Sequence, residues 1–289
     1  MKAAYFSKTG RELSGDATKV ELLPPGVTFA PTVTPAPLFT PAPAGFLPIV
    51  ADLDSSENPS PDASPEPPVR TKATRYEENP LGDILEPFIG QIRDNADIAG
   101  QLSLDGLIGE TVMMRNNTYY LTHRVDGSFS ESGAAFLDEG CQIRRPPENL
   151  HVRGQSTVEG RVFAPLWFYA SEGVSFAQQH ALIRMDTLYE QAQYILFAVI
   201  ETGGSRAYFN YGGYPSFQTD AQMLGHVEQA KALSRFDIPI DVLPSDRLLT
   251  LSTIHPQASD RVLVLLARRL RPGESIASFG SALASMTIK

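Results

Sequence analysis

The chain has little cysteine and little positive charge. Cys141 is the single cysteine among 289 residues, so no intramolecular disulfide can form, and one thiol is compatible with any redox compartment. Lys and Arg total 24 against 33 Asp and Glu, which gives a formal net charge of −9. The sequence therefore has no basic stripe that could neutralise phosphates. This argues against a nucleic-acid partner and disfavours anionic lipid surfaces.

Long hydrophobic runs are also missing. No stretch reaches the roughly 18 consecutive apolar residues that a transmembrane helix needs. The first eight residues, MKAAYFSK, lack the apolar segment of a secretory signal. We therefore expect neither a membrane anchor nor a signal peptide in the chain as given. Hydrophobic residues still make up 42% of the sequence, which is enough for an ordinary buried core.

Proline is concentrated at the start of the chain. Most of the 23 prolines precede residue 81, in one cluster at 30–43 and an acidic one at 59–68. Proline removes backbone donors and fixes φ, so such a stretch is typical of an extended linker rather than a core. We expect residues 1–78 to form a disordered linker or tail, serving either as a spacer or docking segment or as nothing more than a tail. The folded domain is then expected at 79–289.

Helical signals are few. Asn79 is a good N-cap and Pro80 suits the first helical position. The apolar residues Leu81, Ile84, Leu85, Phe88 and Ile92 follow at helical spacing, which predicts one amphipathic helix. A second helix is predicted from Thr219, which forms a capping box with Gln222, and a third over 163–176.

The rest of the chain shows short apolar or aromatic segments separated by Gly, Asn, Asp and Pro. These segments predict strands at 119–121, 134–137, 158–163, 194–200, 248–254 and 262–267. Many short strands with few helices indicate a mainly β protein, a closed or nearly closed β-barrel with helices packed outside it.

Several segments, in the same order along the chain, resemble class B sortases. They are NADIAGQL (95–102), YYLTH (119–123), FLD (136–138), DTLYE (186–190), YILFAV (194–199), SRFD (234–237) and DRLLTLST (246–253). The resemblance covers roughly residues 80–270. It implies a sortase-type barrel at the surface of Gram-positive bacteria. That family cleaves a sorting signal through a cysteine acyl-enzyme and passes the acyl group to a peptidoglycan amine.

Two of the three catalytic positions that the resemblance implies have changed. The nucleophilic cysteine would follow TLST, where this chain has Ile254, whose side chain cannot attack a carbonyl. The histidine position falls on Gln155, and an amide does not exchange protons near neutral pH. Arg261 occupies the arginine position, and we expect it to face Ile254 across the hairpin, with 255–260 as the turn. The chain is therefore interpreted as a pseudo-sortase, and whether any enzymatic activity remains is open.

Three functions follow from this interpretation. The first is a non-catalytic receptor, scaffold or regulator that binds an extended, sorting-signal-like peptide or an active sortase, through a groove lined by Ser252, Thr253, Arg261 and the loop containing Tyr208 and Tyr211. The second is an active cysteine transpeptidase or peptidase with Cys141 as a displaced nucleophile. The third is a stable but degenerate product without a role.

No cofactor is expected, since the sequence shows no metal-ligand spacing and no phosphate-cradling glycine loop. The resemblance favours an extracytoplasmic location.

Overall fold

The computed structural model describes residues 82–158 and 161–289. The proline-rich segment 1–78, and the predicted helix start at Asn79 and Pro80, lie outside the described residues.

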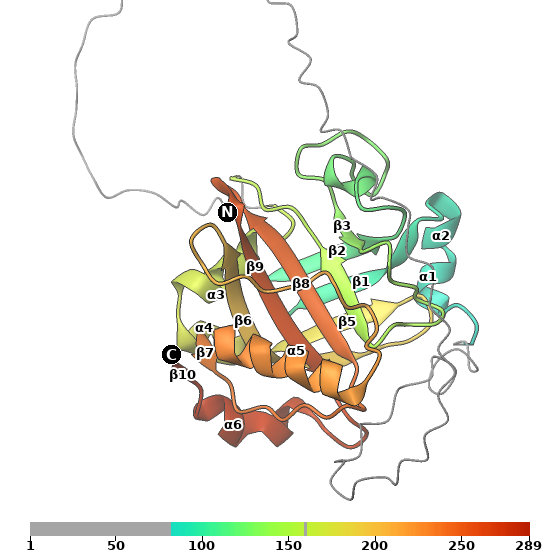
Figure 1. Cartoon of the computed structure of the whole chain (residues 1–289). Coiled ribbons are helices and arrows are strands. Elements are labelled where there is room, and N and C mark those ends of the chain that lie inside the picture. The colour runs from blue at the N-terminus through green and yellow to red at the C-terminus, as the bar shows by residue number, and fades with distance from the viewer. Residues whose placement is uncertain (1–81, 159–160) are drawn as a thin grey trace, which may run out of the picture. The chain divides into compact units, whose positions relative to one another are not determined.

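Within the described residues, eight strands close into a barrel (Figure 1). They are β1 (Ile98–Leu104), β2 (Ile108–Met113), β3 (Ala135–Leu137), β4 (Asn149–Arg153), β5 (Leu182–Thr187), β6 (Gln193–Gly203), β8 (Leu248–His255) and β9 (Ala258–Arg269). Their order is β1-β2-β3-β4-β8-β9-β6-β5, and β5 pairs with β1 to close the ring. The β2–β3 and β4–β8 pairs are parallel and the others antiparallel. Closure removes the exposed edges of the sheet. The predicted fold class is confirmed.

Short helices lie outside the barrel (Figure 1). They are α1 (Glu86–Ile89), α2 (Gln91–Asp94), η1 (Tyr119–Leu121), η2 (Ala164–Trp167), α3 (Phe168–Ser171), α4 (Val174–Gln179), α5 (Asp220–Leu233), η3 (Ile276–Phe279) and α6 (Gly280–Ala284). A separate two-stranded sheet pairs β7 (Phe236–Asp237) with β10 (Thr287–Ile288). The longest of these helices, α5, runs across the outside of the barrel, as Figure 1 shows.

The first predicted helix differs from the structure. Pro87 lies in the first turn of α1, which begins only at Glu86, because proline favours the start of a helix. Gly90 then separates α1 from α2, so the periodic segment forms two single turns rather than one helix. Among its apolar residues, Phe88 is buried in the core.

Two predicted strands are wrong. Residues 119–121 form the 3-10 helix η1, because the Asn116 Oδ1 atom accepts hydrogen bonds from the backbone N–H groups of Thr118 and Tyr119 and so initiates a turn. In the predicted strand 158–163, residues 159–160 lie outside the described residues, and Val162 makes an isolated bridge with Ser156. Both edges of β4 are already paired, with β3 and with β8.

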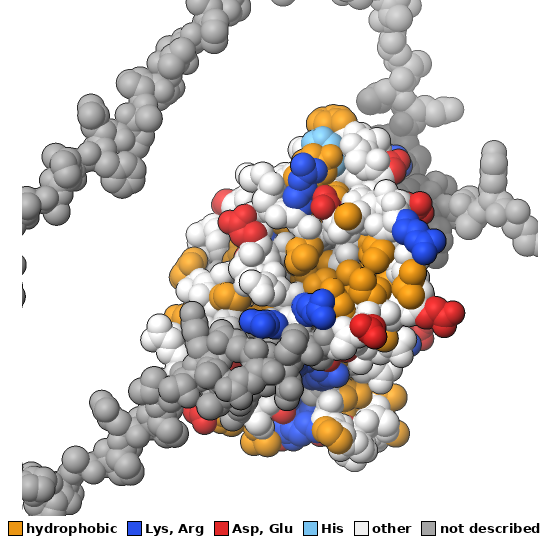
Figure 2. All heavy atoms as spheres, turned by 90° about the vertical axis from the view of Figure 1, so that its right-hand side faces the viewer, with side chains coloured by type: hydrophobic (Ala, Val, Ile, Leu, Met, Phe, Trp, Pro, Cys, Tyr) orange, Lys and Arg blue, Asp and Glu red, His pale blue; other side chains and the backbone are white. Residues whose placement is uncertain are grey.

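A cavity of about 900 Å³ lies on the side of the barrel that carries α2. Its lining includes Leu107, Ile108 and Val125 together with charged residues such as Arg124 and Glu110. Burial raises the pKa of Glu110. Figure 2 shows hydrophobic side chains gathered between charged ones on this face. None of the predicted site residues lines this cavity.

Candidate functional site

The predicted nucleophile and histidine positions lie at neighbouring strand ends. Arg153, the last residue of β4, pairs in parallel with Ser252, and the backbone N–H of Gly154 donates to the Ser252 carbonyl at 3.2 Å. The next residue, Gln155, therefore follows the end of β4 beside the end of β8, where Ile254 is 40% exposed. The Gln155 Nε2 atom donates to the carbonyl oxygen of Leu121 at 3.3 Å. This pair holds no thiol and no imidazole.

Arg261 does not face Ile254, contrary to the sequence prediction. Ile254 pairs with Val262, whereas Arg261 pairs with Gly203 of β6. Side chains alternate between the two faces of a strand, so this offset of one residue puts Arg261 on the other face of β9 from Val262. The cause is a bulge in β9. Residues 256–257 alone connect β8 to β9 and His255 pairs with Ala258, but Ile254 pairs with Val262, so the register shifts between the two pairs.

Arg261 is held by a buried carboxylate instead. Its Nη2 atom lies 2.7 Å from the Oε2 atom of Glu201, whose side chain is 6% exposed. Arg206 and Arg235 also contact this carboxylate, at 3.0 and 2.9 Å. The Arg261 guanidinium lies over the Trp167 ring at 5.6 Å. These contacts fix Arg261 away from the exposed Ile254 side chain.

An apolar pocket lies next to the end of β8. Its volume is about 400 Å³, and its walls include Val158, Pro165, Trp167, Phe168 and Pro256. Val158 and Phe168 are 72% and 45% exposed, unusually high for large apolar side chains. The pocket can therefore accept an apolar side chain of a ligand.

A buried polar group that the sequence did not single out lies deeper along β8. The His151 Nε2 atom is 2.8 Å from Ser252 Oγ, and its Nδ1 atom is 4.0 Å from Asp138 Oδ2. The Tyr211 ring meets the imidazole edge to face, with 5.8 Å between ring centroids. Burial lowers the pKa of His151 to about 4, so the ring is neutral at neutral pH. His151 pairs with Thr250 in the β4–β8 ladder, two residues before Ser252, and no motif in the sequence marks it.

Cys141 lies behind this group. Its Sγ atom accepts a hydrogen bond from the backbone N–H of His151 at 3.4 Å and lies 3.8 Å from the Asn149 carbonyl oxygen. Burial raises the pKa of the Cys141 thiol to about 11. The thiol is therefore protonated near neutral pH, a state in which it is a poor nucleophile.

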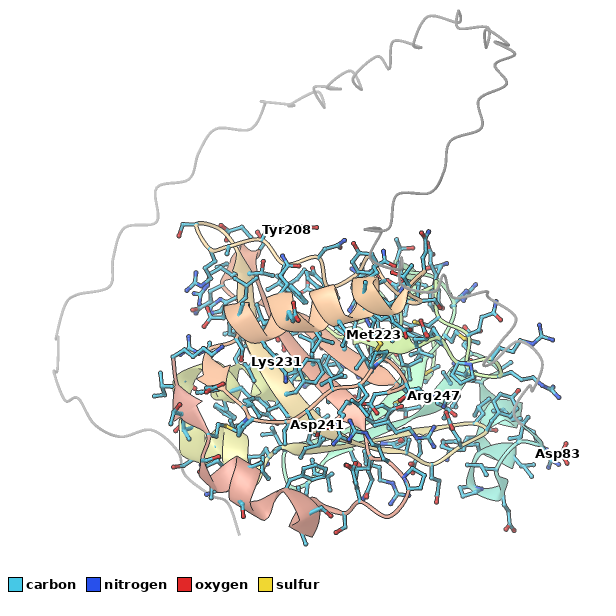
Figure 3. All side chains as sticks on the ribbon, turned by 60° about the horizontal axis from the view of Figure 1, so that its bottom comes forward. Asp83, Tyr208, Met223, Lys231, Asp241 and Arg247 are labelled. Carbon is cyan, nitrogen blue, oxygen red and sulfur yellow. The ribbon has the colours of Figure 1, made fainter. Side chains whose placement is uncertain are left out.

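The remaining predicted binding residues are not all brought together. Ser252 and Tyr211 both contact His151. Thr253 Oγ1 instead pairs with Ser156 Oγ at 2.6 Å and, by alternation along β8, lies on the other face from Ser252. Tyr208 is 74% exposed and lies at the periphery of the folded part (Figure 3).

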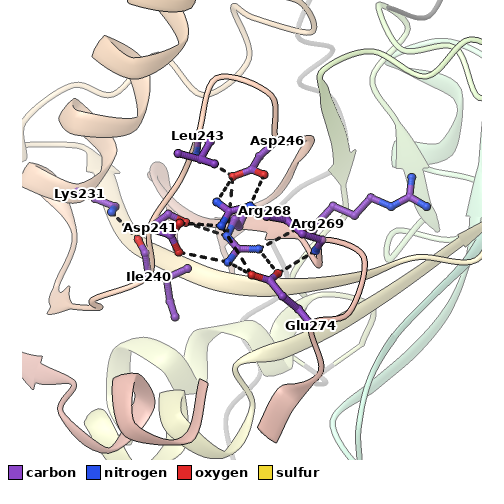
Figure 4. Close-up of polar contacts among 9 residues, drawn as sticks. Lys231, Ile240, Asp241, Leu243, Asp246, Arg268, Arg269 and Glu274 are labelled. Carbon is purple, nitrogen blue, oxygen red and sulfur yellow. Dashed lines mark hydrogen bonds and ion pairs between the residues drawn. The ribbon is translucent and has the colours of Figure 1, made fainter. Parts of the chain in front are cut away.

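A second charged cluster lies at the other end of β8 and β9 (Figure 4). Arg268 is fully buried, with Nη1 2.6 Å from Glu274 Oε2 and Nε 2.8 Å from the Asp241 carbonyl oxygen. Arg271 binds Asp246 at 2.7 Å. Every one of these charges has a partner, so the cluster fixes the segments before β8 and after β9 and has a structural role.

Two classes of site are absent from 82–158 and 161–289. No group of three or more His, Cys, Asp or Glu residues could hold a metal ion in this part of the chain. None of the helices described there is long and apolar enough to cross a membrane.

The comparisons with known proteins agree on the fold. No family model matches the chain. Sortase B from Staphylococcus aureus is 23% identical over 176 residues, which cover 59% of this chain and 70% of that protein. The S. aureus sortase B–substrate complex superposes with a TM-score of 0.59 at 22% identity, over 66% of this chain and 88% of that one. Sortase B from B. anthracis gives 0.59 at 22% identity, over 68% and 91%. The chain has a class B sortase-like fold.

Proposed function

We propose that this protein binds an extended peptide at the end of β8 without the cysteine transpeptidation of sortases. The observation that carries the proposal is Ile254, which occupies the predicted nucleophile position as an exposed apolar side chain and directly precedes His255, a residue that lines an apolar pocket. Isoleucine can contact a peptide side chain but cannot form an acyl-enzyme, so binding without chemistry is the expected outcome at this position.

The similar proteins support a peptide as the ligand. One matched structure is a sortase B–substrate complex from S. aureus, and another is sortase B in complex with triglycine. A barrel that retains the fold and loses the thiol would act as a receptor or scaffold for such a peptide, or as a regulator of an active sortase.

Binding and cleavage can be measured on the same sample. Fluorescent sorting-signal peptides should show a higher anisotropy on binding, and doubly labelled versions should show no cleavage that a thiol-blocking reagent abolishes. Ile254→Asp should weaken binding, because it replaces an exposed apolar contact surface at the end of β8 with a charge. Leu243→Asp is the matched control, since Leu243 is exposed to a similar extent, 46% against 40%. Equal affinity of both variants and the wild type would contradict the proposal.

The cysteine hypothesis has one supporting contact, the 3.4 Å hydrogen bond between the His151 backbone and the Cys141 sulfur. Cys141→Ala separates the two functions. Peptide cleavage that disappears in this variant would establish Cys141 as a nucleophile. Unchanged binding with no cleavage in either protein would favour the receptor.

A further inference from the structure

The group around His151 has the arrangement of a nucleophile, a base and an orienting acid. Ser252 Oγ lies 2.8 Å from His151 Nε2, within the reach needed for proton transfer. If the serine hydroxyl donates to Nε2, the ring carries its proton on Nδ1. That nitrogen is buried and has no hydrogen-bond partner among the described residues, and the nearest carboxylate, Asp138, is 4.0 Å away.

Asp138 is itself held in place. Its Oδ2 atom accepts from Asn117 Nδ2 at 3.1 Å and its Oδ1 atom from the Gly140 backbone at 3.1 Å. Arg153 Nη1 contacts the same Oδ2 atom at 3.5 Å. A small approach of the ring would bring Nδ1–H within hydrogen-bond distance of a carboxylate that is already oriented.

A guanidinium group, that of Arg153, lies on the same face of β4 as His151. Arg153 pairs directly with Ser252 in the parallel ladder, and it shares its face of β4 with His151 because the two are separated by two residues. Arg261, by contrast, is on the other face and bound to Glu201. Arg153 is thus the guanidinium placed to stabilise an oxyanion that develops near Ser252.

Ser252 also lies on the path of a peptide that occupies the end of β8. It is two residues before Ile254, and therefore about 7 Å away along the strand on the same face. A peptide seated on Ile254 and extended along β8 would place a backbone carbonyl over the serine.

We propose that Ser252, His151 and Asp138 form a serine acyl-transfer site for extended peptides, with Arg153 at the oxyanion. This inference rests on the proposed function for its substrate class. Ser252 Oγ bonds to the carbonyl carbon and passes its proton to His151 Nε2. The C–N bond breaks and the amine leaves with that proton. Water then attacks the ester, gives a proton back through His151, and releases a carboxylic acid and free Ser252.

The site is closed in this structure. Ser252 and His151 are each 4% exposed. Tyr211 covers the imidazole, and a Cβ on Gly212 would lie 3.9 Å from its Cε1 atom. The loop that carries Tyr211 must therefore move before a substrate reaches the serine, so the activity is expected to be slow in the wild type and faster when the ring is removed.

A fluorophosphonate probe tests the nucleophile without a peptide. The serine oxygen displaces fluoride, and intact mass with peptide mapping identifies the modified residue. We expect an adduct on Ser252 that forms faster in Tyr211→Ala and is absent in Ser252→Ala. Ser156→Ala is the matched control, since this serine bonds Thr253 and not His151, and it should label like the wild type. No adduct on Ser252 in either the wild type or Tyr211→Ala would overturn the proposal.

The base and the orienting acid need separate readouts. His151→Gln keeps a polar side chain and should slow labelling by about a hundredfold. Asp138→Asn should slow it and also move the pH midpoint of labelling downward, because the Asp138 charge raises the pKa of His151 while Arg153 lowers it. The other titratable groups beside the ring, Tyr211 and Cys141, remain protonated over the acid range because burial raises the pKa of each. An unchanged rate in His151→Gln would exclude the base.

Folding and peptide binding are followed in parallel. Circular dichroism and thermal melting show whether each variant is folded. The variant Ser252→Cys places a thiol of similar size at the same position, and its alkylation by iodoacetamide should depend on His151. If the probe does not label Ser252 but the peptides still raise the anisotropy, the serine site is rejected and the proposed function stands. If the probe labels Ser252 but the peptides do not bind, the proposed function is rejected and Ser252 remains a reactive nucleophile.

Discussion

At the scale of single residues, restoring a cysteine at position 254 should not restore its reactivity. In Ile254→Cys, made in a Cys141→Ala background, the new thiol faces Val262, while Arg261 is bound to Glu201 and His255 packs against Trp167. We expect iodoacetamide alkylation to follow a titration with a midpoint near the ordinary thiol value of about 8.5. Rates measured from about pH 6 to about pH 10, on either side of that value, check this. A midpoint below about 7 would show an activating environment at this position.

The buried arginine gives a prediction about stability. Removing Arg268 takes the nearest cation from Glu274 and leaves Arg271 as the remaining partner of Glu274 and Asp246, and breaking a buried ion pair from one side typically costs about 3–5 kcal/mol. Arg268→Leu should therefore lower the free energy of unfolding by about that amount in urea titrations. Arg269→Leu is the control, since Arg269 is 30% exposed and pairs with Glu190, for a loss of about 1 kcal/mol at most. Equal losses would argue against a structural role for the buried cluster.

Single residues also show what the sequence could and could not reveal about the site. The positions of Ile254 and Gln155, at the ends of β8 and β4, follow from the motifs around them. The orientation of Arg261 was not predictable, because the bulge between the His255–Ala258 and Ile254–Val262 pairs reverses the face of the later residues in β9. His151 belongs to no motif. Its significance comes from Ser252 on a strand about a hundred residues later in the chain, a contact that only the fold creates.

At the scale of elements, local chemistry decided which predictions succeeded. The helix α5 was predicted from its N-cap, and β3, β6, β8 and β9 from their apolar runs. The strands β1, β2, β4 and β5 were not predicted because they mix polar and apolar residues, and β1 and β2 also contain Gly100 and Gly109. A Cβ on Gly100 would lie 2.0 Å from the Asp186 carbonyl oxygen, so β1 is defined by its packing against β5 rather than by propensity.

The cap of α5 can be tested directly. Thr219 Oγ1 accepts from the Gln222 backbone N–H at 3.1 Å, as predicted. The reciprocal bond differs, because the Gln222 side chain accepts from Gln218 rather than from Thr219. Thr219→Ala should cost about 1 kcal/mol of unfolding free energy, and Thr219→Ser, which keeps the acceptor, only a few tenths. A chemical denaturation series on both variants measures the difference, and an equal loss in both would assign the effect to packing instead.

At the scale of the whole molecule, two buried histidines couple folding to acid. Burial lowers the pKa of both His151 and His226 from 6.5 to about 4. His226 packs against Phe209, Tyr214 and Phe217, and neither of its ring nitrogens has a hydrogen-bond partner in the described part of the chain. As the pH falls, the two histidines are therefore protonated in the unfolded chain before they are protonated in the folded protein.

Acid should therefore destabilise the barrel. Stability from the two histidines is complete above pH 6.5 and is lost as the pH falls from 6.5 towards 4, at about 1.4 kcal/mol per pH unit for each ring. Phe suits the aromatic surroundings of His226. His226→Phe should therefore reduce the dependence of the unfolding free energy on pH by the contribution of one histidine. Urea denaturation of the wild type and His226→Phe at several pH values between these limits provides the measurement.

His123→Phe is the matched control for this experiment. His123 also stacks on an aromatic ring, that of Tyr119, and lies outside the buried cluster around His226, so the variant shows what the loss of a histidine elsewhere does to the slope. A slope that His226→Phe leaves unchanged would mean that the acid sensitivity of the barrel arises from other groups. A reduced slope would show that the aromatic cluster of Phe209, Tyr214 and Phe217 is stable only around a neutral ring. Because Phe209 and Tyr214 flank Tyr211 in the chain, the loop that covers Ser252 would then loosen in acid, and access to the serine would rise as the stability falls.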